Sequence, residues 1–152
     1  MVRLVKVDND NSWIVKSIEV DDDQERYVDT PASFLKIAKN DPNCIPMLIY
    51  NDDFPVGFFV YGIIEDVYVI AGLMIDMNHQ RKGYGKKAME MIIDEIKKDK
   101  EHNTISINVS EHNTVAEKLY RNLGFDYSGG GYFMVDEDKG TFTNFYRMDL
   151  VY

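Results

Sequence analysis

A short basic loop containing two glycines is the part of this sequence whose residue types most directly suggest chemistry. The loop runs from Gln80 to Gly85 and leads into a helical pattern. The positive end of a helix dipole favours acids, yet no acid lies between Gln80 and Met89. No Ser, Thr, Asp or Asn lies between Gln80 and Lys87 to cap the helix, so several backbone N–H groups need another partner. The helix start instead carries the cations Arg81, Lys82, Lys86 and Lys87.

Phosphate binding is the chemistry that this loop suits. A phosphate would accept the free N–H groups and neutralise the cations. Gly83 and Gly85 would let the backbone approach it closely, because glycine has no Cβ. The chain has 17 basic and 26 acidic residues and a net charge of −9, so cations clustered at one helix start favour a phosphate site over a solvated lysine face. The Walker pattern fails because Lys87 stands where Ser or Thr would bind magnesium, and the dinucleotide pattern lacks its third glycine.

Two segments of the chain resemble the motifs of the GNAT N-acetyltransferase superfamily. Leu73–Lys86, with Q-x-x-G-x-G at the end of an apolar strand pattern, is similar to the cofactor motif. Asn113–Phe125 is similar to the second motif. The resemblance covers nearly the whole chain, and more narrowly the chain resembles the bacterial diamine, spermine and spermidine N-acetyltransferases.

The resemblance implies acetyl-CoA as the acetyl donor. It implies that backbone groups of Leu73–Ile75 pair with pantetheine as an added strand, in a gap between the fourth and fifth strands. The N–H groups from Arg81 to Lys86 are implied to hold the pyrophosphate, and Asn113 is implied to contact the cofactor from the next helix. The implied cofactor-binding residues are Leu73, Met74, Ile75, Gln80, Arg81, Lys82, Gly83, Tyr84, Gly85, Lys86 and Asn113.

Tyr120 is the residue that the resemblance places as the general acid. A phenol with an ordinary pKa of about 10 is protonated at neutral pH and can donate to a departing thiolate. The substrate amine would attack the thioester directly, with a backbone N–H near Met74 as the oxyanion donor. No metal is expected, because the three histidines show no ligand spacing. Cys44 has no histidine nearby in the sequence that would make it a nucleophile.

Acids that could act as the general base or bind the acceptor form a second set of candidates. Several polyamine enzymes of the superfamily place a Glu on the fourth strand, where this chain has Ala71. Glu65 or Asp66 could act as the base through a water molecule, and Asp22 and Glu25 could bind a cationic acceptor. The alternative for each of them is a solvated surface acid.

The predicted acceptor is a small cationic amine such as spermidine or spermine. The alternatives are another amine (an aminoglycoside, an amino acid or a protein N-terminus) or a non-catalytic acyl-CoA-binding sensor. The acidic composition fits a cationic partner and disfavours nucleic acid and anionic membrane surfaces. The resemblance also implies a homodimer, formed through the Tyr- and Phe-rich C-terminal strands.

One α/β domain over residues 1–152 is expected to position these residues. Its order is β-α-α-β-β-β-α-β-α-β-β, and the resemblance implies a mixed, mostly antiparallel sheet of about six to seven strands with about four helices. A Thr114–Glu117 capping box opens the last helix, leaving the Asn113 amide free, and Gly124 ends it. The strands are predicted over Val2–Val7, Ile45–Tyr50, Val56–Ile64, Val67–Ile75, Thr104–Val109, Phe125–Val135 and Thr141–Leu150, and the other helices over Asn11–Val20, Pro31–Asn40 and Lys86–Lys98.

The expected location is the cytoplasm. No apolar run approaches the roughly 20 residues that a membrane-spanning helix needs. Cys44 is the single cysteine, which excludes an internal disulfide and fits a reducing compartment.

Overall fold

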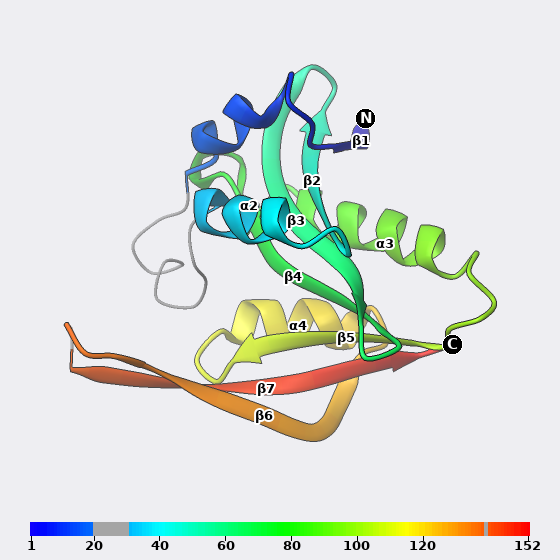
Figure 1. Cartoon of the computed structure of the whole chain (residues 1–152), viewed down its shortest axis with the longest axis vertical. Coiled ribbons are helices and arrows are strands. Elements are labelled where there is room, and N and C mark those ends of the chain that lie inside the picture. The colour runs from blue at the N-terminus through cyan, green and yellow to red at the C-terminus, as the bar shows by residue number, and fades with distance from the viewer. Residues whose placement is uncertain (20–30, 139) are drawn as a thin grey trace.

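A seven-stranded sheet forms the centre of the computed structural model, which describes residues 1–19, 31–138 and 140–152 (Figure 1). The strands lie in the order β1-β2-β3-β4-β5-β7-β6, and among the described strands β4 and β5 form the one parallel pair. This confirms the predicted mixed, mostly antiparallel α/β sheet. The strands are β1 (Val2–Lys6), β2 (Cys44–Asn51), β3 (Phe54–Ile64), β4 (Val67–Ile75), β5 (Thr104–Ser110), β6 (Asp126–Asp136) and β7 (Thr141–Val151).

The helical segments follow the predicted order along the chain. They are η1 (Ser12–Ser17), α2 (Pro31–Asn40), η2 (Met77–His79), α3 (Tyr84–Ile96) and α4 (Thr114–Asn122). Helix α3 begins two residues earlier than predicted, directly after Gly83. Among the described helices, none is long and apolar enough to cross a membrane.

The helix predicted over residues 11–20 is a shorter 3-10 helix. It ends at Ser17, whose hydroxyl donates to the Ile14 carbonyl at 2.6 Å, and Ile18 is already extended. A serine hydroxyl that occupies a carbonyl of the preceding turn competes with helix continuation. The Glu19 N–H donates to the side chain of Asp76, 57 positions away, rather than to a helical carbonyl. A long-range contact therefore limits this helix.

The sheet is covered on both faces, and its strand residues divide between two apolar clusters. On one face, Val15 of η1 and Leu35 of α2 pack with Leu48 and Phe58. On the other face, α3 and α4 pack against alternate residues of the same strands. Figure 1 shows α2 and α3 on opposite sides of β2–β4. This arrangement follows from the two-residue period of a strand, which sends neighbouring side chains to opposite faces.

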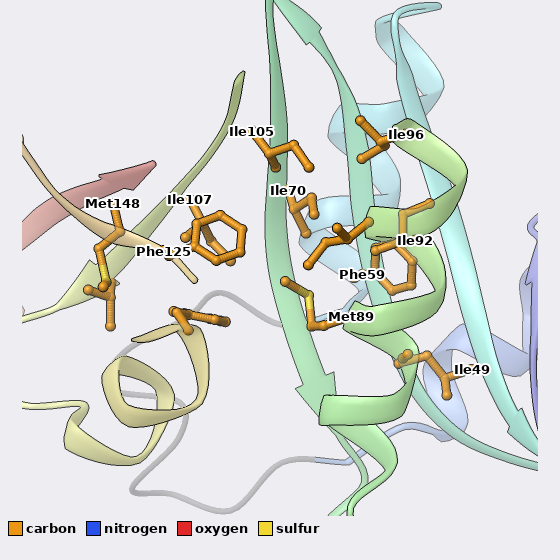
Figure 2. Packing of buried hydrophobic residues seen from close by; sticks show 14 of the residues in the cluster. Ile49, Phe59, Ile70, Met89, Ile92, Ile96, Ile105, Ile107, Phe125 and Met148 are labelled. Atoms are coloured by element: carbon orange, nitrogen blue, oxygen red, sulfur yellow. The ribbon is translucent and has the colours of Figure 1, made fainter. Parts of the chain in front are cut away.

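Helix α3 is held by the larger cluster, shown in Figure 2. Its residues Met89, Ile92 and Ile96 point toward Phe59 and Ile70 of the central strands, and all five are at most 2% exposed. Burying such a side chain fully stabilises the fold by about 1.5–3 kcal/mol. The helix that follows the basic loop therefore rests on a rigid support.

Candidate active site

The parallel strands β4 and β5 are paired along only part of their length. Their register runs from Tyr68–Ile105 to Ile70–Ile107 and stops there, although β4 continues to Ile75. Residues 71–75 therefore keep the β3 partner on one side and have no strand partner on the side of β5 within the described chain. An unpaired strand edge presents N–H and C=O groups that an extended ligand can pair with. This is the edge on which Leu73–Ile75 are predicted to bind pantetheine.

A β-bulge in β4 lies where the two strands stop pairing. Val60 pairs with Ala71 and Phe58 with Met74, so Gly72 and Leu73 together oppose one residue of β3. The extra residue changes the face of the sheet to which the following side chains of β4 point. Ile70 packs in the α3 cluster, whereas Met74, four positions later, packs in the opposite cluster.

Gly72 is the residue that makes this bulge possible, and the sequence reading missed its role. Its φ is +65°, and a Cβ built on it would lie 3.0 Å from the ring of Phe34 in α2. An isolated glycine within an apolar strand pattern is the signal that could have predicted the bulge.

The basic loop has the uncapped helix start that the sequence predicted. Gly83 is the N-cap residue with φ +81°, no side chain caps the helix, and its first turn contains no acid. Among the described residues, the first helical N–H that donates to a protein acceptor is that of Lys87. It bonds to the Gly83 carbonyl at 3.1 Å. Four N–H groups at a helix start have no partner within the helix. The exposed cations Arg81, Lys82, Lys86 and Lys87 surround this start.

The two glycines of the loop have different roles. Nothing lies within 4 Å of a Cβ built on Gly83, so its left-handed backbone, rather than crowding, requires glycine there. A Cβ on Gly85 would lie 3.6 Å from Ile75 Cγ1 and 3.9 Å from Leu119 Cδ2. Gly85 therefore brings the end of β4, the start of α3 and helix α4 together. Tyr84 anchors the same helix start, because its hydroxyl accepts a hydrogen bond of 2.9 Å from Asn51 Nδ2 of β2.

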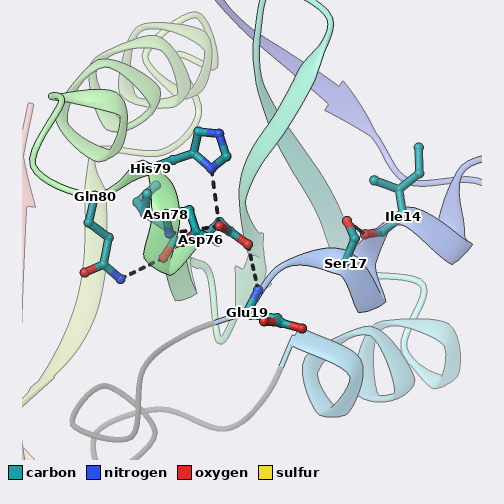
Figure 3. Close-up of polar contacts among 8 residues, drawn as sticks. Ile14, Ser17, Glu19, Asp76, Asn78, His79 and Gln80 are labelled. Atoms are coloured by element: carbon teal, nitrogen blue, oxygen red, sulfur yellow. Dashed lines mark hydrogen bonds and ion pairs between the residues drawn. The ribbon is translucent and has the colours of Figure 1, made fainter.

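Gln80, predicted to contact the cofactor, turns its side chain back to the strand. Its Nε2 donates to the Ile75 carbonyl at 3.0 Å, as Figure 3 shows. Next to it, Asp76 is the N-cap residue of η2, and its carboxylate accepts hydrogen bonds from Glu19, Asn78 and His79. The loop is thus held at its root by side chains that a pattern search for phosphate binding does not single out.

Helix α4 is capped by Asn113, and the predicted Thr114 cap is wrong. Asn113 Oδ1 accepts a hydrogen bond of 3.2 Å from the Ala116 N–H, and Thr114 is the first helical residue. Asparagine and threonine are both good N-cap residues. The position at which the chain leaves β5 makes Asn113, rather than Thr114, the residue directly before the helix. One lone pair of the Asn113 amide oxygen is therefore used, and the predicted cofactor contact would use its second lone pair or its Nδ2. Because β4 and β5 are parallel, their carboxyl ends lie at the same end of the sheet, and so do the starts of α3 and α4.

The end of α4 has the predicted cap and fixes Tyr120. The Phe125 N–H donates to the Tyr120 carbonyl at 3.0 Å, the Gly124 N–H donates to the Arg121 carbonyl at 3.0 Å, and Gly124 has φ +102°. These bonds form a Schellman motif. The rings of Tyr120 and Phe125 have centroids 6.0 Å apart. Tyr120 is buried, and burial raises the pKa of its hydroxyl well above the ordinary value. Within the described residues, that hydroxyl forms no hydrogen bond.

The candidate acids that the structure describes, Glu65 and Asp66, are not brought together with the loop. Glu65 and Asp66 form the turn between β3 and β4, at the opposite end of β4 from the loop. At about 3.3 Å per residue, that strand separates them from Ile75 by roughly 30 Å. Asp66 contacts His102 there, with 3.1 Å between Oδ1 and Nε2. Asp22 and Glu25 lie outside the described residues. In the described ranges, no group of three or more His, Cys, Asp and Glu residues is placed to hold a metal ion.

The sequence matches a known family, and the fold resembles solved members of it. Residues 10–125 match the family described as "Acetyltransferase (GNAT) family". The spermine/spermidine N(1)-acetyltransferase of Bacillus subtilis strain 168 is 25% identical over 136 residues, covering 84% of this chain and 90% of that protein.

Two solved structures show the same fold. The ribosomal-protein-S18-alanine N-acetyltransferase of Escherichia coli has a TM-score of 0.75 and 21% identity, covering 99% of this chain and 94% of that one. The spermidine N-acetyltransferase of Vibrio cholerae, solved with CoA and spermine, has a TM-score of 0.77 and 15% identity, covering 99% and 95%. The family match spans most of the chain and includes both the basic loop and Tyr120, so this chain is an acetyltransferase that belongs to the GNAT family.

Proposed function

We propose that this protein transfers the acetyl group of acetyl-CoA to a small cationic amine, a polyamine such as spermidine or spermine. The observation that carries the proposal is the uncapped, basic start of α3 beside the unpaired edge of β4. A pyrophosphate suits the former because it accepts backbone N–H groups, and pantetheine suits the latter because its amides pair like a strand. The similarity to the Bacillus subtilis spermine/spermidine enzyme supports the choice of amine.

In the proposed reaction, the acceptor nitrogen first loses a proton to solvent, and the neutral amine then attacks the thioester carbonyl directly. The C–N bond forms, the C–S bond breaks, and the coenzyme A thiolate takes a proton from Tyr120. The product nitrogen loses one proton to solvent and Tyr120 regains one, so the reaction is balanced. A raised pKa keeps the Tyr120 phenol protonated at neutral pH, which is the form that a general acid needs. A backbone N–H near Met74, beside the bulge, is the proposed oxyanion donor.

A thiol-release assay with acetyl-CoA tests this function. The acceptors are spermidine, spermine, an aminoglycoside, free amino acids and a peptide with a free N-terminus. We expect release with the polyamines at a rate well above that without acceptor. Release with another acceptor alone would contradict the polyamine assignment. Calorimetric binding of CoA without release for any acceptor would indicate a sensor.

We also propose that the protein is a homodimer joined through the β6–β7 hairpin. Strand β6 is at the edge of the sheet, and four consecutive residues from Tyr132 to Val135 are 48–66% exposed. Phe142 of β7 is 64% exposed. An exposed apolar edge strand is a surface that favours pairing with another chain. Light scattering during gel filtration should give a dimer for the wild type and a monomer for Phe133→Lys, and a monomeric wild type would contradict the proposal.

A further inference from the structure

A buried carboxylate joins two segments beside the basic loop. Asp76 follows β4 directly and is 6% exposed. Its Oδ2 accepts a hydrogen bond of 3.0 Å from the Glu19 N–H, and its Oδ1 accepts bonds from the Asn78 N–H at 3.0 Å and from His79 Nδ1 at 3.2 Å. Figure 3 shows the carboxylate between the two sides. One oxygen serves the turn that leads to the loop, and the other serves Glu19, the last residue of the Ser17–Glu19 segment that ends η1.

Backbone hydrogen bonds reinforce this junction. The Met77 N–H donates to the Glu19 carbonyl at 2.6 Å, and the Asp76 N–H donates to the Val56 carbonyl of β3 at 2.8 Å. Burial alone would raise the pKa of Asp76, but its three hydrogen bonds outweigh burial and hold that pKa below the ordinary value. The carboxylate is therefore ionised at neutral pH and able to accept from all its donors.

A turn with the same Asp-x-x-His spacing lies at the other end of α3. Both turn donors bond to Oδ1 of Asp76, whereas at Asp99 they are divided between the two carboxylate oxygens. Asp99 also accepts from the N–H two positions on, that of Glu101 at 2.9 Å, and from the histidine three positions on, His102 Nδ1 at 2.8 Å. Its third donor is the Tyr68 hydroxyl at 2.8 Å. Asp99 thus performs the same local task at a distance from the basic loop. Variants of Asp99 therefore serve as controls that show the effect of weakening such a turn away from the basic loop.

We propose that Asp76 is a positioning residue that sets the basic loop and the Ser17–Glu19 segment relative to each other, so that both coenzyme A and the acceptor amine depend on its carboxylate. The loop begins within four residues of Asp76, and its N–H groups are useful only if they point at the pyrophosphate. The Ser17–Glu19 segment is bonded through Glu19 to Asp76 and Met77 and so lies beside the end of β4, the strand along which the proposed function places the thioester. This inference rests on the proposed function for its amine readout.

Four variants separate positioning from simple support of a turn. Asp76→Ala removes the acceptor on both sides, whereas Asp76→Asn keeps one oxygen and offers an N–H₂ donor where the second oxygen was. Asparagine is a good helix cap, so it preserves the turn and loses the bond to Glu19. Asp99→Ala and Asp99→Asn are the matched controls. The measurements are the Kd of CoA by calorimetry, the KM of the amine and the melting temperature.

We expect Asp76→Ala to bind CoA about tenfold more weakly and Asp99→Ala to stay within about twofold of the wild type, although both melt earlier. Asp76→Asn should raise the KM of the amine about tenfold and change the Kd of CoA by less than about threefold. Asp99→Asn should change neither. If Asp76→Ala does not fold, the amine KM of Asp76→Asn decides.

Equal CoA binding by the two alanine variants would overturn the inference for the loop. An amine KM for Asp76→Asn no higher than that for Asp99→Asn would overturn it for the Ser17–Glu19 segment. A wild-type protein that binds no CoA would instead contradict the proposed function, so the two failures are distinguishable.

Discussion

The two ends of helix α3 both adjoin an Asp-x-x-His turn, but only the start of the helix has backbone N–H groups without a cap. Each end has an Asp-x-x-His turn, Asp76 to His79 before the helix and Asp99 to His102 after it. At the far end, the donors and acceptors pair within the protein. Asp99 accepts from Tyr68, and the outer nitrogen of His102 reaches Asp66. At the near end, the turn is equally well satisfied, but the helix start beyond it has neither a cap nor an acid.

This difference separates the turns, which support the fold, from the uncapped helix start, which suggests a binding site. A hydrogen-bonded turn is needed wherever a helix meets a strand, so neither Asp-x-x-His turn is by itself a sign of a site. Unfilled N–H groups among exposed cations cost stability unless a ligand uses them. We therefore propose that the near end binds an anion, and the far end serves as its internal control.

The largest expected effect comes from replacing a tyrosine by phenylalanine, in one variant at the proposed active site (Tyr120) and in the other at the far end of α3 (Tyr68). Tyr120→Phe should lower turnover by about 10²- to 10⁴-fold and leave the Kd of CoA unchanged, because only proton donation to the thiolate is lost. Tyr68→Phe should lower the melting temperature, since the phenol is bonded to Asp99, but not turnover. Steady-state kinetics with CoA calorimetry checks both. Unchanged turnover in Tyr120→Phe would remove it from the mechanism.

Glycine with a left-handed backbone offers the next comparison. Gly83→Ala should weaken CoA binding, because an alanine at φ +81° costs about 1–2 kcal/mol and shifts the N–H groups of the helix start. Gly140→Ala has similar strain at φ +64° in the hairpin turn, also without nearby atoms. It should cost stability alone. Calorimetry and thermal melting separate the two outcomes, and equal CoA binding by both variants would contradict the role given to the loop.

The smallest effect concerns pH at the far end. The hydrogen bond that His102 donates to Asp99 is the largest cause that raises the pKa of His102. A raised folded-state pKa means that His102 stabilises the fold fully below its ordinary value of about 6.5 and loses this contribution as pH rises through the folded pKa. The melting temperature of wild type minus that of His102→Gln should therefore fall as pH rises above about 6.5. CoA binding should not differ between them, and a difference that grows with pH would contradict the assignment.

The sequence predicts some parts of this site well for identifiable reasons. The uncapped start of α3 is readable because caps and charges act within one helical turn. The Gly124 cap is readable for the same reason. The cap of α4 is mispredicted by one residue because Asn113 and Thr114 are both suitable, and the exit from β5 selects one of them.

Other features depend on contacts between distant segments. The bulge at Gly72 is set by its fit against Phe34 and by pairing with β3, neither of which shows in an apolar run. The bond from Glu19 to Asp76 joins residues 57 positions apart and shortens a helix that propensity alone would extend. Such features need the fold before they can be seen.

Amide chemical shifts during a CoA titration test the central claim most directly. The account predicts that the backbone N–H signals of residues 81–86 shift most, together with those of Leu73–Ile75, while those of the Asp99–His102 turn stay in place. Shifts of equal size at both ends of α3, or none at residues 81–86, would contradict the claim that the near end holds the pyrophosphate.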